Sequence, residues 1–536
     1  MTYIRRSIIQ GTNDSGTIVD VPVTQEGHIE VAIHAPRLPF GSVHTESLTP
    51  IFQVDPVYGI NTTEIVSTTG RAIAGANSAA TTGTGNLFTC STGTTSYSFA
   101  TLQTRKRLRY RAGQGVIGRF TALWPARADS AYLIAGFGTS ESGFYFGYAH
   151  LASDGLTSQE FGIFHVTGGV RAIRTLTVSV GASSSANVAV VLNSATGVNI
   201  AVTSGDTTTI VANKIAAGTY AGWKASARGA TVIFLADDAA VKSGTYTATG
   251  SGVTASFATT LEGVKSTDTF IPRSTWNGDK LDGTGASGVT LDPTKGNVFQ
   301  IGIQYLGFGA ITFSVEVDSS GNNPDFVTVH TISIPNTRTT TSVNQPSFPF
   351  TITAYSAGST TDLSVKCGSC AGFIEGDVRL TGPRSSFSDV STAVADGAGI
   401  YYTLFSIRND YIHGHTGTTE RANQSVVNIL SFGGAHDDAT PIIYYLLRNA
   451  TLVGTPSWTR WDSSSCIYYE TAATTATITG NGQIIQVIPV GQAGTILLPL
   501  EDTTTLQPGE TLTVAARAVT GTSTFTIATL NTREDQ

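Results

Sequence analysis

The sequence predicts an all-β protein built from tandem jelly-roll or β-sandwich domains. Charged residues make up only 13% of the 536 residues, about half the roughly 25% of an average globular protein, and helical surfaces are normally rich in Glu and Lys. Apolar and polar side chains alternate with a period of two over many short segments, which is typical of half-buried strands. Clusters of Gly, Ser, Asn and Asp separate these segments as turns. The length predicts several domains, because one core rarely serves more than about 250–300 residues.

Residues 1–60 are predicted to form an extended N-terminal arm for assembly or docking. Short strands are expected at residues 17–22 and 28–33, but prolines prevent a continuous sheet; they are Pro22, Pro36, Pro39, Pro50 and Pro56. The arm also carries apolar side chains, among them Phe40, Ile51 and Phe52. These would have to pack on another subunit or on the domain that follows.

Residues 61–175 and 265–380 are predicted to be the two parts of one central jelly roll. In Val298–Tyr305 and Ile311–Asp318 every second residue is apolar, and Leu306-Gly-Phe-Gly309 between them fits a hairpin connection. Further strands are expected at residues 116–124, 132–137, 144–148, 161–165 and 362–367. Residues Gly113–Gly118 match the G-x-G-x-x-G pattern of dinucleotide-binding motifs. The strand expected at residues 116–124 follows in place of the helix that the motif requires, so we assign the match to chance.

Residues 176–264 are predicted to form a small α+β subdomain inserted into the jelly roll. They are rich in Ala, Thr, Ser and Val, and a short helix is expected at Thr207–Ala217 with Asp206 as its N-cap. Residues 381–536 are predicted to form a separate C-terminal β-sandwich. Its expected strands lie at residues 425–432, 442–447, 484–490, 511–519 and 525–530.

Charge, hydropathy and cysteine content limit which partners and structural sites the chain can have. The formal charge of −7 argues against nucleic acid as a partner. The first residues lack a signal-peptide pattern and no apolar run has membrane-spanning length, so we expect synthesis in a cytoplasm without membrane insertion. Four cysteines are too few for a disulfide scaffold, and Cys367 and Cys370 lack the second pair of a structural zinc site, so free thiols are expected.

The segment Arg105–Arg111 is the most distinctive charge pattern. On a strand, Arg105, Arg107, Arg109 and Arg111 share one face, opposite Lys106, Leu108 and Tyr110. One interpretation is a solvated edge strand whose charges prevent aggregation. The other is a contact to acidic groups of a neighbouring subunit, a host polysaccharide or nucleic acid, among which the subunit is favoured.

Local motifs give no support for an enzyme. The nucleophile elbow, the zinc-protease helix motif and the phosphate loop are missing, so no catalytic residue and no cofactor is assigned. His413 and His415 could present two imidazoles on one side of a strand, where a three-fold axis would gather them around a metal ion. Most such pairs are polar loop residues, so no metal is expected.

Seven segments carry a resemblance to known proteins: Pro36–Ser42, Tyr110–Leu123, Trp276–Gly285, Leu291–Lys295, Gln304–Ala310, Leu506–Leu512 and Leu530–Gln536. They resemble virion structural proteins of tailed bacteriophages and some large DNA viruses. The segments are distributed along the chain outside the insertion, which resembles small modules inserted in other phage proteins. The resemblance implies a tail, baseplate, fibre or capsid-surface protein with lectin-like jelly rolls and homo-oligomeric assembly, and it implies no catalytic residue.

The sequence therefore predicts a non-enzymatic virion protein, a tail, baseplate or fibre component that binds itself, as a trimer for example, and other virion proteins. Contact with host surface glycans would use aromatic platforms, for which Trp458, Trp461 and Tyr468 are candidates. The favoured alternative is that these three rings belong to the core. Two alternatives stay open: a polysaccharide-degrading tailspike, which needs paired carboxylates in a groove, and a capsid-surface decoration protein without receptor binding.

Overall fold

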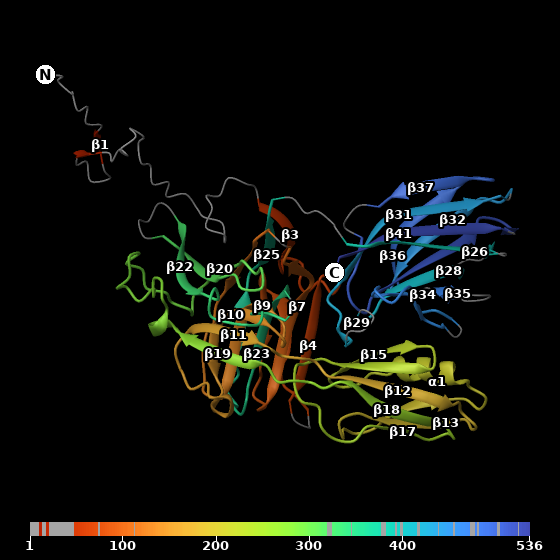
Figure 1. Ribbon diagram of the computed structural model, residues 1–536, viewed down its shortest axis with the longest axis horizontal. Coiled ribbons are helices and arrows are strands. Elements are labelled where there is room, and N and C mark those ends of the chain that lie inside the picture. Colours follow the sequence, from red (N-terminus) through yellow and green to blue (C-terminus); the bar gives the residue numbers. More distant parts are fainter. Residues whose placement is uncertain are drawn as a thin grey trace.

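The computed structural model shows antiparallel sheets throughout, which confirms the all-β fold class (Figure 1). It describes residues 10–12, 18–20, 48–72, 76–111, 113–318, 324–344, 346–376, 382–391, 394–396, 400–414, 419–437, 439–453, 456–471, 477–479, 482–500, 504–523 and 525–535. The predicted arm before residue 48 lies outside this set, apart from a small hairpin of β1 (Gln10–Thr12) and β2 (Ile18–Asp20).

Two large sheets face each other in the central unit. The β7 sheet has the order β19 (Thr267–Pro272), β11 (Gly162–Thr167), β10 (Gly143–His150), β9 (Ala131–Gly138), β23 (Ser347–Tyr355), β7 (Ser98–Arg109) and β4 (Ile65–Arg71). The β8 sheet has the order β22 (Asp325–Ile332), β21 (Ile311–Val317), β20 (Asn297–Ile303), β8 (Val116–Ala122), β25 (Cys370–Glu375) and β3 (Leu48–Val54). A small sheet of β24 (Ser364–Cys367), β6 (Leu87–Ser91) and β5 (Ala80–Thr84) completes the unit. The strands predicted in this region are thus confirmed.

Aromatic side chains fill the space between these sheets. Phe120 stacks on Phe299 with ring centroids 5.5 Å apart, and Phe146 lies 4.8 Å from Phe299. Trp124 is fully buried, and its indole N–H donates to the carbonyl oxygen of Leu133. Because β8 precedes the insertion and its partner β20 follows it, this core joins chain segments from both sides of the insertion.

Residues 48–54, which the proline pattern assigned to the arm, are the edge strand β3 of the β8 sheet. β3 pairs with β25, and a register irregularity lies at Phe52 and Pro50. Phe52 and Val54 are buried in the central core. Pro50 is tolerated because β3 has a partner on one side alone among the described strands. Packing on the following domain, one of the two outcomes foreseen for Phe52, is therefore what the structure shows.

The insertion has its own core, formed by two small sheets and one helix. The sheets are β15 (Trp223–Arg228), β16 (Thr231–Ala236), β12 (Ile173–Val180) and β18 (Thr254–Leu261), and β14 (Val198–Val202), β13 (Ala186–Val191) and β17 (Thr247–Thr249). Helix α1 (Thr208–Ala216) buries Val211, Ala212 and Ile215 against them.

The predicted helix is confirmed, but its predicted N-cap is wrong. Thr207 is the N-cap, and its hydroxyl accepts a hydrogen bond from the backbone N–H of Ile210. The carboxylate of Asp206 instead accepts from the Lys214 ammonium at 2.6 Å and from the backbone N–H of Thr203. Both residues are good N-caps, and the ion pair occupies Asp206.

The C-terminal unit is a sandwich of two sheets. The β31 sheet contains β26 (Arg384–Ser391), β41 (Thr526–Asp535), β31 (Val426–His436) and β37 (Thr495–Pro499), and β38 (Thr505–Leu506) also pairs with β31. The β28 sheet contains β33 (Thr459–Arg460), β34 (Ile467–Thr471), β28 (Ile400–Asn409), β39 (Thr511–Ala518), β32 (Ile442–Arg448) and β36 (Gln483–Val490), and β35 (Thr477–Thr479) pairs with β28. Short ribbons join β27 (Val394–Ala395) to β40 (Thr522–Ser523) and β29 (Ile412–His413) to β30 (Arg421–Ala422). The predicted strands of this region are confirmed.

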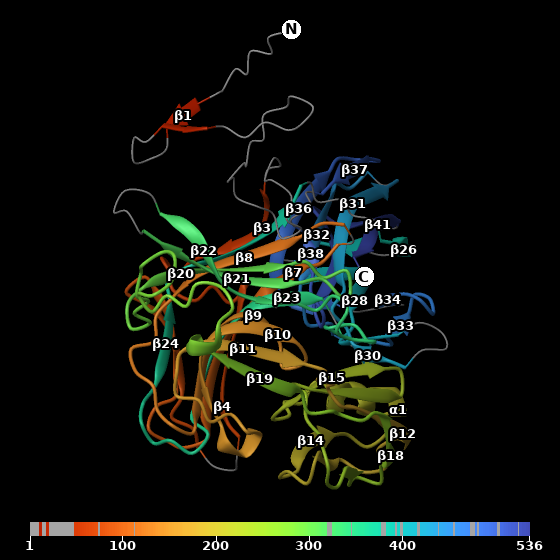
Figure 2. The ribbon, with the colours of Figure 1, turned by 60° about the vertical axis from the view of Figure 1, so that its left-hand side comes forward.

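The three units lie against one another. β15 of the insertion lies beside β29 in Figure 1 and beside β30 in Figure 2, at the base of the C-terminal sandwich. Hydrogen bonds from Ser226 to Asp410 and from Asn213 to Pro456 cross this boundary. Within the described residues, no helix is both long and apolar enough to cross a membrane.

Candidate functional site

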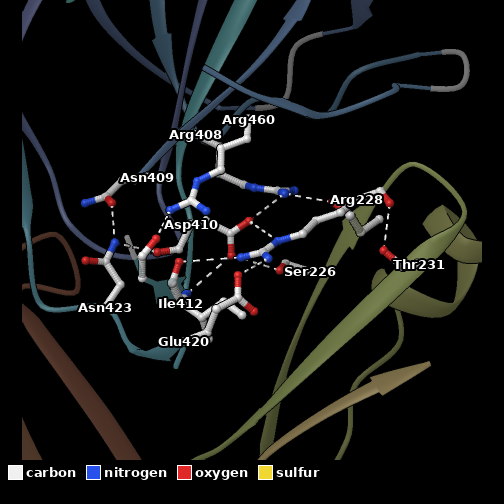
Figure 3. A network of polar contacts seen from close by, with 12 residues as sticks. Ser226, Arg228, Thr231, Arg408, Asn409, Asp410, Ile412, Glu420, Asn423 and Arg460 are labelled. Carbon is white, nitrogen blue, oxygen red and sulfur yellow. Dashed lines mark hydrogen bonds and ion pairs between the residues drawn. The ribbon is translucent and has the colours of Figure 1, made fainter. Parts of the chain in front are cut away.

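A buried carboxylate at the boundary between the insertion and the C-terminal sandwich is the centre of a charged network (Figure 3). Asp410, which follows β28, has a fully buried side chain. Its Oδ2 lies 2.9 Å from Nη2 of Arg408 and 3.5 Å from Nε of Arg228, and its Oδ1 accepts from the Ser226 hydroxyl at 3.0 Å. Arg228 and Ser226 belong to β15 of the insertion, so the carboxylate of one unit is held by donors of another.

The charge of Asp410 is stabilised by its two arginines. Burial alone would raise the pKa of this carboxyl, but the positive charges of Arg228 and Arg408 outweigh burial and lower its pKa to about 2. Asp410 is therefore ionised at neutral pH and accepts hydrogen bonds on both oxygens. A carboxylate so engaged is suited to hold two units together and unsuited to donate a proton as a general acid.

Aromatic rings cover the two arginines. The Arg228 guanidinium lies 4.5 Å from the centre of the Tyr468 ring, and that of Arg408 lies 4.5 Å from the Trp458 ring. These are cation–π distances. Arg228 also donates to Glu420, which precedes β30, at 2.9 Å. Tyr468 and Trp458, the predicted glycan platforms, thus face protein cations inside the chain.

Two amides fix the backbone around Asp410. Asn409 donates to the carbonyl oxygens of Ser425 and Leu506, and Asn423 donates to the side chain of Asn409 and to the carbonyl oxygen of Asp410. Both amides are buried. Because these bonds bring together distant parts of the C-terminal unit, the carboxylate is presented to the insertion on a rigid support.

The predicted arginine ladder forms a second charged boundary. Arg105, Arg107 and Arg109 lie on β7, and Leu108 on the other face is fully buried. Arg105 lies 3.7 Å from Glu510, and Asp535 lies 3.4 Å from Arg109 and 2.8 Å from Arg111. Both carboxylates belong to the C-terminal sandwich of the same chain, so the ladder's acidic contacts in the structure are internal ones.

The remaining predicted site residues are dispersed. Trp461 is 39% exposed and packs on Phe387, with ring centroids 4.4 Å apart. His413 lies on β29, whereas His415 is outside the described residues. The part of the chain that the structure describes holds no cluster of three or more metal-ligating side chains. Its four cysteines are free and buried, as predicted, and burial raises the pKa of each thiol.

Sequence reasoning missed Arg228, Arg408 and Asp410. Arg408-Asn-Asp410 ends the otherwise uncharged segment Ile400–Asp410, and this local change was the available signal. Its partners Ser226 and Arg228 lie more than 180 residues away, with a separation of 184 for Ser226 and Asp410. No spacing rule connects segments so far apart.

The pH dependence of stability provides a test of the Asp410 environment. Its pKa is about 2 in the folded protein and 3.8 ordinarily, so its ionisation stabilises the fold above about pH 4, and this contribution is lost as the pH falls toward 2. We expect the stability advantage of the wild type over Asp410→Asn to shrink by about 2 kcal/mol between pH 5 and pH 2. Urea unfolding at several pH values measures this difference. A constant difference would contradict the assigned ion contacts.

Comparison with known proteins does not place the chain in a family, because no protein-family model and no curated protein matches it.

Proposed function

We propose that the chain is a non-enzymatic structural protein of a virus particle, a tail, baseplate or fibre component that assembles with copies of itself. The resemblance of its sequence segments to virion proteins supports the particle. The charged networks support a structural role, because Asp410, Glu510 and Asp535 are engaged between units of the chain. Such contacts favour a rigid body that recognises neighbours by its surface.

The observation that carries self-assembly is an apolar margin of the C-terminal sandwich. Among the described strands, β36 and β37 each end a sheet, and Ile484, Val487 and Leu497 on them are 47%, 48% and 74% exposed. Both ribbon views place β37 at the outer end of this unit, away from the insertion (Figures 1 and 2). An exposed apolar edge strand offers both side chains and backbone groups to a partner strand.

A second copy of the chain is the partner that this margin fits. Residues 483–500 contain no charged side chain, so two identical margins can meet without like-charge repulsion or the burial of an unpaired charge. Charged edge residues, the usual protection against such pairing, are lacking at this margin. We therefore infer a homo-oligomer formed through β36 and β37.

A charge-introducing variant tests this interface. The double variant Ile484→Lys with Leu497→Lys is expected to weaken self-association at least tenfold, because each copy would bring like charges into an apolar contact. Light scattering coupled to gel filtration, over a range of protein concentrations, gives the molar mass. Val241→Lys, at a 65% exposed site in the insertion, is the matched control and should leave the mass unchanged. A wild type that stays monomeric, or a double variant of unchanged mass, would contradict the inference.

The place in the particle requires a separate experiment. Gold-labelled antibodies against the chain should mark the tail, baseplate or fibres in electron micrographs, whereas labelling of the head would favour the decoration protein. Incubation with host capsule should release no oligosaccharide. Released fragments would establish the tailspike alternative.

A further inference from the structure

Two guanidinium groups of the β7 ladder carry buried nitrogen atoms without a hydrogen-bond partner. Among the described residues, nothing accepts a hydrogen bond from Nη1 of Arg107 or from Nη1 of Arg109, and both atoms are shielded from solvent. Arg109 has Asp535 at 3.4 Å, but Arg111 holds the same oxygen at 2.8 Å. Arg107 has no ion pair within the described part of the chain. The ladder therefore has two buried N–H donor groups, on Arg107 and Arg109, that have no acceptor among the described residues.

Glu141 is the acidic residue whose charge acts on Arg107, and its carboxylate already has other partners. Glu141, in the β9–β10 connection, has a buried side chain whose Oε2 lies 3.1 Å from Nε of Arg171. Its Oε1 accepts from the backbone N–H of Arg171, and its Oε2 also lies 3.5 Å from the Gln424 amide. Burial, and then the positive charge of Arg171, lowers the pKa of Arg107 to about 10, with Glu141 opposing them. Glu141 is thus held by Arg171 and forms no ion pair with Arg107 among the described residues.

An unpaired buried guanidinium is costly, because its nitrogen atoms lose their water without gaining acceptors. At Asp410, by contrast, both arginines have a carboxylate within 3.5 Å, although Nε of Arg228 and Nε of Arg408 also lack a hydrogen-bond partner among the described residues. The ladder departs from that pattern where the central unit meets the C-terminal sandwich. A negatively charged ligand would remove the imbalance.

We propose that Arg107 and Arg109 form a binding site for a small oxyanion, of the phosphate or sulfate type, at this junction. Arg107 and Arg109 project on the same side of β7, two residues apart, which suits two guanidinium groups converging on several oxygens of one ligand. Arg171 adds positive charge from the insertion side. A cleft of about 410 Å³, lined by Arg105, Tyr411 and Glu510, opens at the same junction, although Arg107 and Arg109 do not line it.

Thermal unfolding with inorganic phosphate as the probe tests the site. Phosphate should raise the unfolding midpoint of the full chain above that in sodium chloride of equal ionic strength. At 100 times the dissociation constant, the unfolding equilibrium constant should fall about a hundredfold. Arg107→Gln should abolish this specific shift. Without phosphate it should unfold no earlier than the wild type, because it removes an unpaired buried charge.

Two further variants make the result decisive. Arg127→Gln changes a 39% exposed arginine paired with Asp129, and it should keep the full phosphate shift, which separates binding from the general stabilising effect of phosphate. Arg107→Lys, which keeps the charge without the planar fork, should weaken phosphate binding at least tenfold in calorimetric titration and serves if the Gln variant fails to fold. Equal effects of phosphate and chloride on the wild type, or an unchanged shift in both Arg107 variants, would overturn the proposal.

Discussion

Replacing Asp410 by Ala is expected to lower the free energy of unfolding by about 3–5 kcal/mol, because it leaves Arg228 and Arg408 buried beside a cavity without their shared counterion. The change removes the carboxylate that joins β15 to the end of β28, while the hydrogen bond from Arg408 to the carbonyl oxygen of Ala227 and the contact of Arg228 with Glu420 remain. We expect the insertion and the C-terminal sandwich to separate into distinct unfolding transitions. Differential scanning calorimetry and urea unfolding measure both effects.

Two comparisons identify the cause of this loss. Asp129→Ala removes a 56% exposed carboxylate that lies 3.4 Å from Arg127, and it should cost no more than about 1 kcal/mol. The triple variant Arg228→Met, Arg408→Met, Asp410→Leu should recover much of the stability lost in Asp410→Ala, because it removes the uncompensated charges. If Asp410→Ala is as stable as the wild type, Asp410 does not join the two units.

Much of the fold could be predicted from alternation alone. In strands such as β20 and β21, every second side chain is apolar, and this alternation shows which side chains enter the core. The short connection Leu306–Gly309 fixes the pairing of the two strands. The same rule placed Leu108 and the arginines of β7 on opposite faces, and Leu108 is buried in the structure. Local patterns suffice where the interaction is between neighbours in sequence.

The features that the sequence did not predict depend on contacts between residues that are far apart in the chain or on competition between neighbouring residues. Asp206 and Thr207 are equally plausible N-caps locally, and the ion pair with Lys214 decides between them. Phe52 and Val54 were assigned to the arm because Pro50 interrupts the pattern, yet β25, more than 300 residues later, provides their partner strand. The Asp410 network likewise depends on contacts between units. Charge, unlike alternation, carries no period that reveals which distant group will face it.

A substitution at Phe299 should separate the stability of the central unit from that of the C-terminal sandwich. Phe299 is fully buried and contacts Phe120, Phe146 and Trp124. Phe299→Ala should therefore destabilise the central unit by about 3–5 kcal/mol, through lost burial and the cavity that remains. The C-terminal sandwich has its own core, so its transition should move far less, which calorimetry can resolve.

Phe308→Ala is the matched control, because Phe308 is 40% exposed in the connection between β20 and β21. The same atoms are deleted there without opening a cavity, and a loss below about 1 kcal/mol is expected. A similar loss for both variants would contradict the assigned core. If Phe299→Ala lowers both transitions equally, the two units unfold as one, and the charged boundaries at Asp410 and the β7 ladder are strong enough to couple them. The size of that coupling therefore measures how far the buried charges turn separate sandwiches into a single rigid body.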